Sequence, residues 1–209
     1  MKVELISSMG DDYMSCQRAR VSYDWDKKDY TDKQNDKLLK RLIDDWHFWV
    51  LEWCAATFYI ECDIPTSAQI IRSRTWQYNF LSRRYRDDKN SPFEFIDIIP
   101  RKQNKDRTFE IIEDESIVEK MKEHYKLSVK LYNELIELGL CKEQARYVIP
   151  QGVMTKFYMT MNLRNWLHFL DLRLNEHAQE EVRIVAKAIS DELSKLFPKT
   201  LELYSLRNK

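Results

Sequence analysis

The chain has 209 residues, and its 34 lysines and arginines balance its 34 aspartates and glutamates, so the formal net charge is zero. This length suits one compact domain over residues 1–209, and the charge balance gives no general attraction to nucleic acid or to an anionic membrane. Only three glycines occur, which disfavours a sheet-dominated fold with many tight turns and also a glycine-rich phosphate loop. A phosphate bound by this chain would therefore be held by side chains.

The cysteines and the apolar runs indicate the compartment. The four cysteines show no Cys-x-x-Cys spacing, and no apolar run is long enough for a secretion signal or a membrane span. These features predict a reduced, cytoplasmic protein without a disulfide framework or a metal site. We expect neither a membrane nor a nucleic acid among its partners.

The first part of the chain has strand and helix patterns in turn. Residues 3–6 predict a short opening strand. Apolar residues at three- and four-residue spacing predict an amphipathic helix over residues 35–53, and β-branched and aromatic residues predict a strand over residues 54–64. Pro65 has the position of a first helical residue, so this strand leads into a helix that ends near Arg72.

The second part of the chain is mainly helical. The polar segment of residues 86–107 holds two prolines and is typical of a long loop. A second long amphipathic helix is predicted over residues 114–138, with Gly139 as its C-terminal cap. The remaining predicted elements are a short helix over 142–148, a strand over 155–161, a helix over 163–174, and a last helix over 177–197 that Asn175 opens and Pro198 follows. Helices with three or four strands among them predict an α+β fold.

Residues 72–85, RSRTWQYNFLSRRY, concentrate arginines and aromatic side chains in a chain without net charge. Guanidinium groups grip phosphate in a two-pronged way, and aromatic faces stack on a base or a flavin, so this stretch suits a nucleotide ligand. The alternative is that Trp76, Tyr78 and Phe80 form the inward face of a short strand, while the arginines are solvated or paired with Asp87 and Asp88.

A second polar set follows in Arg146, Asn162, Arg164, His168 and Arg173. Arg164 and His168 are four residues apart and share a face of the predicted helix, so they could reach one ligand together. The alternative for His168, and for His47, is a histidine satisfied on a partly buried face. No Ser-His-Asp set, Cys-His set or paired carboxylates stand out, so the chemistry would belong to a bound cofactor.

Together these segments resemble the flavin-dependent thymidylate synthases. The stretch RSRTWQYNFLSRRY is similar to the family's signature, Arg-His-Arg followed by seven residues and then a serine, and to its extension Ser-x-Asn-Glu-x-Ser-x-Arg-Tyr. ARVSYD (residues 19–24), PTSAQIIR, QARYVIP, FYMTMNLRNWLHFLDLRL and HAQEEVR are similar to family segments in the same order. The likeness covers nearly the whole chain, and its C-terminal part is the most specific.

The resemblance implies a homotetrameric α+β enzyme, a single domain of mixed helices with a small antiparallel sheet. It implies a methyltransferase that binds FAD across subunit interfaces and makes dTMP from dUMP. Methylenetetrahydrofolate would supply the one-carbon unit and NADPH would reduce the flavin. The flavin's hydride, rather than a protein nucleophile, would then work on the pyrimidine ring, which agrees with the missing nucleophile.

The resemblance also implies the site residues. The residues matched to the dUMP site are Gln69, Arg72, Ser82, Arg84, Arg146 and Arg173. The residues matched to the FAD site are His47, Glu52, Arg72, Ser73, Arg74, Asn162, Arg164 and His168. Arg173 is expected at the uracil edge and is the candidate catalytic residue, because a fixed cation there stabilises negative charge in the ring.

The chain departs from the family at the flavin and folate positions. The central histidine of the signature is Ser73, a serine is Gln77 and a glutamate is Phe80, while Trp49 and Trp53 add aromatic surface beside Val50 where the family has a proline. Two alternatives follow: related flavin chemistry at C5 of another pyrimidine nucleotide or with another one-carbon group, and a non-catalytic nucleotide- or nucleic-acid-binding relative. The sequence assigns no role to residues 87–112.

Overall fold

The structure is a computed structural model, and it describes residues 1–23, 29–73, 76–86, 92–105 and 109–207. The chain forms two compact units. Unit 1 consists of Met1–Glu61, Ala68–Asn79 and Lys156–Lys209, and unit 2 consists of Cys62–Ser67 and Phe80–Thr155. Every helix in the described part of the chain is too short or too polar to cross a membrane.

The described residues combine helices with short strands. The strands are β1 (Lys2–Met9), β2 (Ala55–Asp63), β3 (Gln77–Phe80), β4 (Arg101–Gln103), β5 (Phe109–Ile111) and β6 (Met154–Asn162). The helices are α1 (Asp12–Arg20), α2 (Asp32–Asp44), α3 (Ile64–Ile70), α4 (Glu115–Glu137), α5 (Lys142–Ala145), α6 (Leu163–Arg173), α7 (Glu180–Leu196) and α8 (Pro198–Arg207), with 3-10 helices η1 (Phe48–Trp53) and η2 (Arg146–Val148). This content confirms the predicted α+β class of mixed helices and a small sheet.

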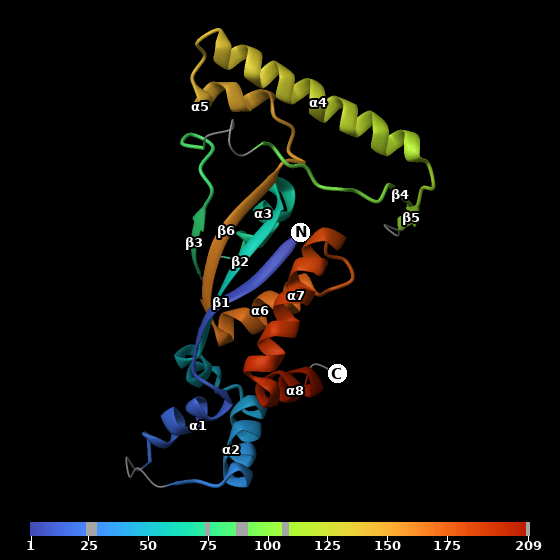
Figure 1. Ribbon diagram of the computed structural model, residues 1–209. Coiled ribbons are helices and arrows are strands. Elements are labelled where there is room, and N and C mark those ends of the chain that lie inside the picture. The colour runs from blue at the N-terminus through green and yellow to red at the C-terminus, as the bar shows by residue number, and fades with distance from the viewer. Residues whose placement is uncertain (24–28, 74–75, 87–91, 106–108, 208–209) are drawn as a thin grey trace. The chain divides into compact units, whose positions relative to one another are not determined.

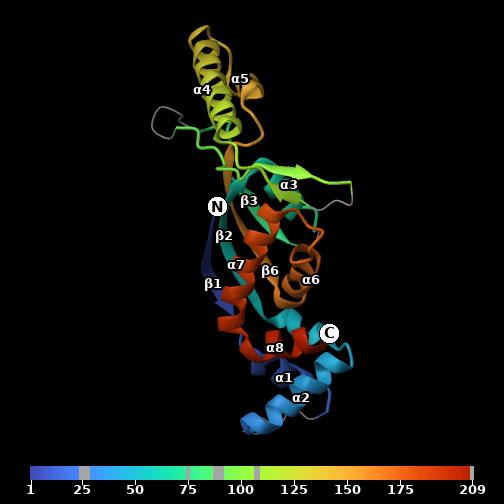
Figure 2. The same cartoon turned by 90° about the vertical axis from the view of Figure 1, so that its right-hand side faces the viewer.

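A four-stranded sheet with the strand order β1-β2-β6-β3 runs through unit 1 (Figure 1). β1 pairs with β2 in the antiparallel sense, from Lys2 opposite Glu61 to Met9 opposite Ala55. Buried and more exposed residues alternate along β2 and β6, as expected for strands that cover a core with one face. Helices α6 and α7 lie on that face of the sheet (Figure 2).

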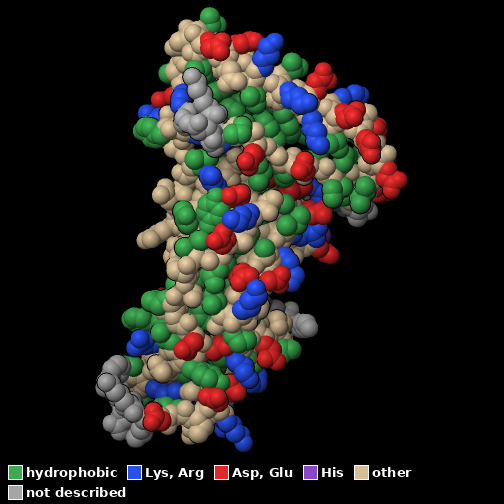
Figure 3. Space-filling model, viewed as in Figure 1, with side chains coloured by type: hydrophobic (Ala, Val, Ile, Leu, Met, Phe, Trp, Pro, Cys, Tyr) green, Lys and Arg blue, Asp and Glu red, His purple; other side chains and the backbone are tan. Residues whose placement is uncertain are grey.

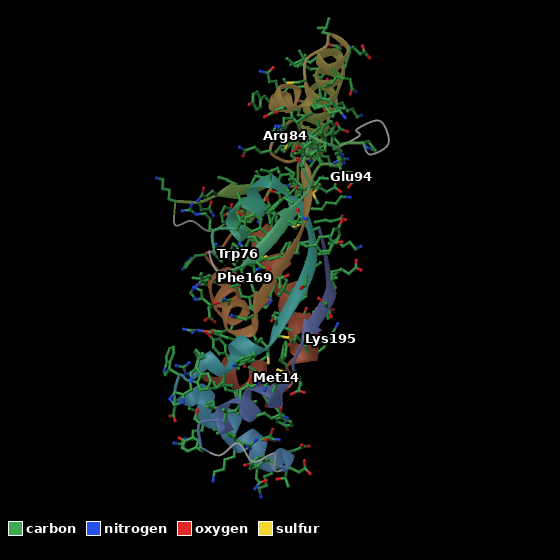
Figure 4. All side chains as sticks on the ribbon, turned by 90° about the vertical axis from the view of Figure 1, so that its left-hand side faces the viewer. Met14, Trp76, Arg84, Glu94, Phe169 and Lys195 are labelled. Atoms are coloured by element: carbon green, nitrogen blue, oxygen red, sulfur yellow. The ribbon has the colours of Figure 1, made fainter. Side chains whose placement is uncertain are left out.

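Aromatic packing fixes α6 on the sheet. The indole of Trp166 is fully buried and meets Phe58 of β2 edge-on, with ring centroids 5.1 Å apart. Its Nε1 donates a hydrogen bond of 3.1 Å to the carbonyl of Ala56. Phe169, labelled in Figure 4, is also fully buried and lies edge-on to Trp166. The exposed side chains of α6 are therefore presented from a rigid support.

A buried carboxylate joins the two ends of the chain in unit 1. Asp12 accepts hydrogen bonds from the backbone N–H groups of Lys199 and Thr200, both at 2.9 Å, and from the Thr200 hydroxyl at 2.6 Å. The first N–H groups of a helix have no partner within the helix, so Asp12 caps α8 and also favours its dipole. The side chain is almost fully buried, at 8% exposure.

The predicted helix over residues 35–53 is wrong in its second half. Thr31 and Gln34 form a capping box that starts the helix earlier, at Asp32, and α2 ends at Asp44. The N–H of Trp46 then donates to the carbonyl of Ile43, and the N–H of His47 donates to the carbonyl of Leu42. These two bonds form a Schellman motif, which terminates a helix, and η1 follows it.

The C-terminal helices also differ from the prediction. The predicted helix over residues 177–197 begins only at Glu180, because Asn175 uses its side chain on the N–H of His177, at 2.9 Å, and so holds a separate turn. Pro198 does follow the helix, but it also starts α8, which the apolar pattern did not indicate. Proline suits a first helical position because its missing N–H is not needed there.

Unit 2 contains the long helix α4, as predicted. Asp114 caps the start of α4 by accepting a hydrogen bond from the N–H of Ser116. Gly139 follows the C-cap Leu138 and has a φ of 92°, the left-handed conformation that ends many helices. Tyr125 of α4 stacks on Phe95, with ring centroids 4.2 Å apart. The predicted loop over residues 86–107 is wrong in one part, because β4 pairs with β5 as a short antiparallel ladder. The expectation of little regular structure holds for the rest of its described residues.

Exposed charges are mixed in sign. Basic and acidic side chains are interspersed on the face shown in Figure 3, in line with the zero net charge. Several form i,i+4 pairs along helices, such as Lys40 with Asp44 at 2.8 Å and Lys187 with Asp191 at 2.6 Å. Exposed pairs of this kind add little stability.

We expect the substitution Asp12→Asn to lower the free energy of unfolding by about 2 kcal/mol, because an amide nitrogen would face N–H donors that the carboxylate now satisfies. Urea denaturation followed by circular dichroism measures this change. Asp191→Asn, in an exposed pair, is the matched control and should change stability by less than about 0.5 kcal/mol. Equal effects of the two substitutions would contradict the capping role.

Candidate functional site

Arg173 is the last residue of α6, and it holds a partly buried guanidinium in unit 1. Asn162 starts this helix by accepting from the N–H of Asn165 at 2.9 Å. An Nη of Arg173 donates to the carbonyl of Gln69 at 2.6 Å, while its buried Nε has no hydrogen-bond partner among the described residues. Burial lowers the pKa of Arg173, although a guanidinium remains charged in proteins. The Gln69 carbonyl thus fixes the orientation of the charged guanidinium of Arg173.

Gln69 is held from two sides. Its side-chain amide donates to the side chain of Gln179, whose own amide donates to Glu181 at 2.8 Å. The backbone carbonyl of Gln69 accepts a hydrogen bond from Arg173 and another from the N–H of Arg72 at 3.4 Å. The structure therefore brings together Gln69 and Arg173, two of the predicted dUMP residues. Gln179 was not predicted, although it lies in the matched segment HAQEEVR.

The turn after α3 carries part of the predicted signature. Arg72 is exposed, whereas the hydroxyl of Ser73 is buried and has no hydrogen-bond partner among the described residues. Arg74, predicted at the flavin site, lies outside the described residues. A buried hydroxyl without a partner is costly in a finished core, so Ser73 suits contact with a polar ligand group.

Three of the predicted flavin residues lie on η1 and α6, and a fourth, Asn162, is the last residue of β6. Arg164 of α6 forms an ion pair of 2.5 Å with Glu52 of η1, and His168 is exposed four residues further along the same helix face. The shared face of Arg164 and His168 is as predicted. Asn162 caps α6, so its side-chain oxygen already serves the helix.

His47 lies at a cavity of about 250 Å³ in unit 1. The cavity is lined by Ala19, Arg20, Ser22, Tyr23, Leu38, Arg41, Leu42, His47 and Trp49. Its charged lining is entirely basic, and three of its side chains are aromatic. This chemistry fits an anionic group beside a planar ring, and the volume suits one part of a dinucleotide cofactor rather than the whole molecule.

Sequence reasoning did not assign roles to the two cavity arginines. Arg20 donates to Asn35 at 2.7 Å and lies over the ring of Tyr30, and Arg41 pairs with Asp45 at 3.4 Å. The segment ARVSYD was matched to the family as a whole, without roles for its residues. Arg41 lies in no segment that was matched to the family, and arginines on the polar face of an amphipathic helix are usually solvated.

Unit 2 brings Ser82, Arg84 and Arg146 together. Arg84, labelled in Figure 4, lies in the turn after β3, and its N–H donates to the hydroxyl of Ser82 at 3.4 Å. Its Nε forms a half-exposed ion pair with Glu143 at 3.3 Å, and the Nε of Arg146 donates to the carbonyl of Glu143 at 3.0 Å. Glu143 was not predicted, although it organises both arginines.

The strand alternative for residues 76–80 is true in part. β3 is a strand, but Tyr78 is 54% exposed, so the side chains do not form one inward face. The proposed partners Asp87 and Asp88 lie outside the described residues. Among the residues that the structure describes, no group of three or more His, Cys, Asp or Glu side chains could hold a metal ion.

The sequence model of the thymidylate synthase complementing protein family (Thy1) matches residues 4–199. The chain is 34% identical to the flavin-dependent thymidylate synthase of Thermotoga neapolitana over 202 residues, which is 97% of this chain and 89% of that relative. It is 35% identical to the flavin-dependent thymidylate synthase of Pyrococcus furiosus over 185 residues, which is 85% of this chain and 72% of that relative.

Among solved structures, the fold is similar to that of PolB from Streptomyces cacaoi, a UMP/dUMP methylase. The complex with 5-Br dUMP has a TM-score of 0.85 at 26% identity and covers 98% of this chain and 94% of that chain. The complex with 5-Br UMP has a TM-score of 0.83. The resemblance drawn from the motifs is confirmed: this chain belongs to the flavin-dependent thymidylate synthase family.

Proposed function

We propose that this protein is a flavin-dependent thymidylate synthase that converts dUMP to dTMP. Methylenetetrahydrofolate donates the one-carbon unit, and one hydride from NADPH with one proton from solvent balances the reaction. The observation that carries the proposal is Arg173, a partly buried cation that the Gln69 carbonyl orients and whose Nε has no hydrogen-bond partner among the described residues. We further propose a single functional domain over residues 1–209 and a cytoplasmic homotetramer.

The phosphate of the nucleotide is assigned to unit 2. A phosphate can replace the half-exposed carboxylate of Glu143 as the partner of Arg84, because the exposed pair is weak and phosphate carries more charge. Arg146 and the hydroxyl of Ser82 supply further donors. Holding the phosphate by side chains agrees with the small number of glycines in the chain.

The pyrimidine ring is assigned to Gln69 and Arg173. Negative charge develops on the ring carbonyl oxygens when C5 is activated, and a fixed guanidinium stabilises that charge more than it stabilises the neutral ring. Burial strengthens this effect because less water screens the charge. Arg173 is therefore the candidate catalytic residue, and Gln69 orients it through its backbone carbonyl.

We assign FAD to unit 1, where the cavity beside His47 has room for one part of the cofactor and the buried Ser73 hydroxyl offers a hydrogen-bonding group. When bound, the reduced flavin supplies a hydride to the pyrimidine. Arg20 and Arg41 are suited to hold phosphate or other anionic groups, and Trp49 offers a stacking surface. Arg72, Arg74, Glu52, Asn162, Arg164 and His168 complete the proposed set.

UMP is a second candidate substrate. The solved neighbours are UMP/dUMP methylases and were captured with both 5-Br dUMP and 5-Br UMP. A chain of this fold can therefore accept either sugar, and the departures at Gln77 and Phe80 fall within the signature itself.

Product analysis tests the proposed function. We expect the purified protein with FAD, NADPH, methylenetetrahydrofolate and dUMP to yield a nucleotide that has gained one CH2 unit, as measured by mass spectrometry. Parallel reactions with UMP and dCMP identify the substrate. Methylation of UMP alone would establish the second candidate, and failure to methylate any of the three nucleotides by a protein that binds FAD would contradict both.

The phosphate assignment predicts a specific binding loss. Arg84→Ala should weaken dUMP binding about 10- to 100-fold, because a hydrogen bond to a charged group contributes about 1.5 to 3 kcal/mol. Isothermal titration calorimetry measures the dissociation constant. Arg101→Ala is the matched control, since Arg101 also lies in unit 2 and stacks over Phe109. An unchanged dUMP affinity in Arg84→Ala would show that the phosphate lies elsewhere.

A further inference from the structure

Trp46 adopts a backbone conformation that suits glycine. Its φ is 62°, and among the described residues no other non-glycine residue has a positive φ. It occupies the position directly after the cap of α2, where the Schellman motif requires a left-handed residue. A bulky aromatic side chain is strained in this region, because its Cβ crowds the backbone. Such strain persists only where surrounding structure imposes it.

Burial does not impose this conformation, because the Trp46 side chain is 69% exposed. The contact that the structure provides is Arg207, the last residue of α8. Its guanidinium carbon lies 3.2 Å from the centre of a Trp46 ring and 5.3 Å from that of Phe48, in cation–π contact with both. The rings of Trp46 and Phe48 are 5.5 Å apart.

The second ring contact anchors the cluster on α8. Phe48 lies 5.7 Å from Tyr204, also on α8, and the Tyr204 hydroxyl donates to Asp171 of α6 at 2.5 Å. One turn of α8 therefore contacts both aromatic residues that flank His47. The planar guanidinium of Arg207 suits this stacking, which a lysine ammonium would reproduce only in part.

The strained residue directly precedes His47. The N–H of His47 completes the Schellman motif by donating to Leu42 at 2.8 Å, so the direction in which the chain leaves α2 depends on the left-handed turn at Trp46. From there the chain places His47 and Trp49 at the cavity and Glu52 against Arg164. Loss of the turn would displace all of these residues.

We propose that Arg207 is a positioning residue for the flavin site. Its stack on Trp46 offsets the strain at that residue and keeps residues 46–53 in the conformation that binds FAD. This inference rests on the proposed function, because it takes His47 and Glu52 as flavin contacts. It assigns to the C-terminal helix a role in cofactor affinity, without direct contact between Arg207 and FAD.

A comparison of Trp46→Ala with Trp46→Gly separates the effect of backbone strain at residue 46 from the effect of losing the contact with Arg207. Both substitutions remove the indole and its stack with Arg207. Alanine retains the steric cost of φ 62°, whereas glycine adopts this conformation freely. We expect Trp46→Ala to raise the dissociation constant for FAD about two- to fivefold, because a smaller fraction of the protein holds the binding conformation, and Trp46→Gly to leave it near the wild-type value.

Substitutions of Arg207 complete the test. Arg207→Ala should weaken FAD binding about two- to fivefold and Arg207→Lys by less, while Arg207→Ala in the Trp46→Gly background should have no further effect. Flavin fluorescence titration measures FAD affinity, and calorimetry measures dUMP affinity without FAD, which should stay unchanged. Lys187→Ala, which removes one cation from the surface of unit 1, is the charge control.

The outcomes distinguish this inference from the proposed function. A wild-type protein that binds no FAD contradicts the proposed function, and the positioning role falls with it. Wild-type FAD binding that Arg207→Ala and Trp46→Ala leave unchanged contradicts only the positioning role. An equal loss from Arg207→Ala in the wild-type and Trp46→Gly backgrounds would also contradict it, because Arg207 would then act without Trp46. If Arg207→Ala does not fold, equal FAD affinities of the two Trp46 variants overturn the inference.

Discussion

The hydrogen bond from Arg173 to the carbonyl of Gln69 is the contact on which the candidate site of unit 1 depends. It joins the last residue of α6 to the end of α3, so it links the helix packed on the sheet through Trp166 to the turn that carries Arg72 and Ser73. A half-buried guanidinium needs fixed acceptors, and a backbone carbonyl is an acceptor that no side-chain motion removes. The geometry of this candidate site thus follows from core packing.

In this chain we expect side chains to bind the phosphate, which a glycine-rich loop binds in many nucleotide-binding proteins. With three glycines in the chain, a backbone cradle for phosphate is hard to build, and the basic residues found here are held instead by local partners. Glu143 holds Arg84 and Arg146 in unit 2, and Asn35 and Asp45 hold the cavity arginines in unit 1. The carboxylates of Glu143 and Asp45 are about half exposed, so an anionic ligand can replace them at little cost, whereas Asn35 is buried and keeps Arg20 in place.

Hydrophobic periodicity predicted the helices whose start and end depend on nearby residues, such as α4 with its Gly139 cap and α6 with its buried aromatic face. It missed the break at Trp46, because a left-handed aromatic residue is rare and its contact with Arg207 joins positions far apart in sequence. It missed α8 because the cap of this helix is Asp12, near the other end of the chain. Motif likeness singled out Arg173, Gln69 and Arg84 as candidates, but their partners Gln179 and Glu143 depend on tertiary contacts that a local pattern does not encode.

In the proposed function, Arg173 is the cation that stabilises the activated pyrimidine, and the substitution Arg173→Lys tests this role most directly. Lysine keeps the charge but cannot hold the Gln69 carbonyl and also present a second directed donor. The decisive measurement is the rate of nucleotide methylation in a single turnover that starts from enzyme with fully reduced FAD. We expect Arg173→Lys to bind FAD normally and to methylate the nucleotide about 100-fold or more slowly than the wild-type enzyme. A rate equal to that of the wild-type enzyme would contradict it.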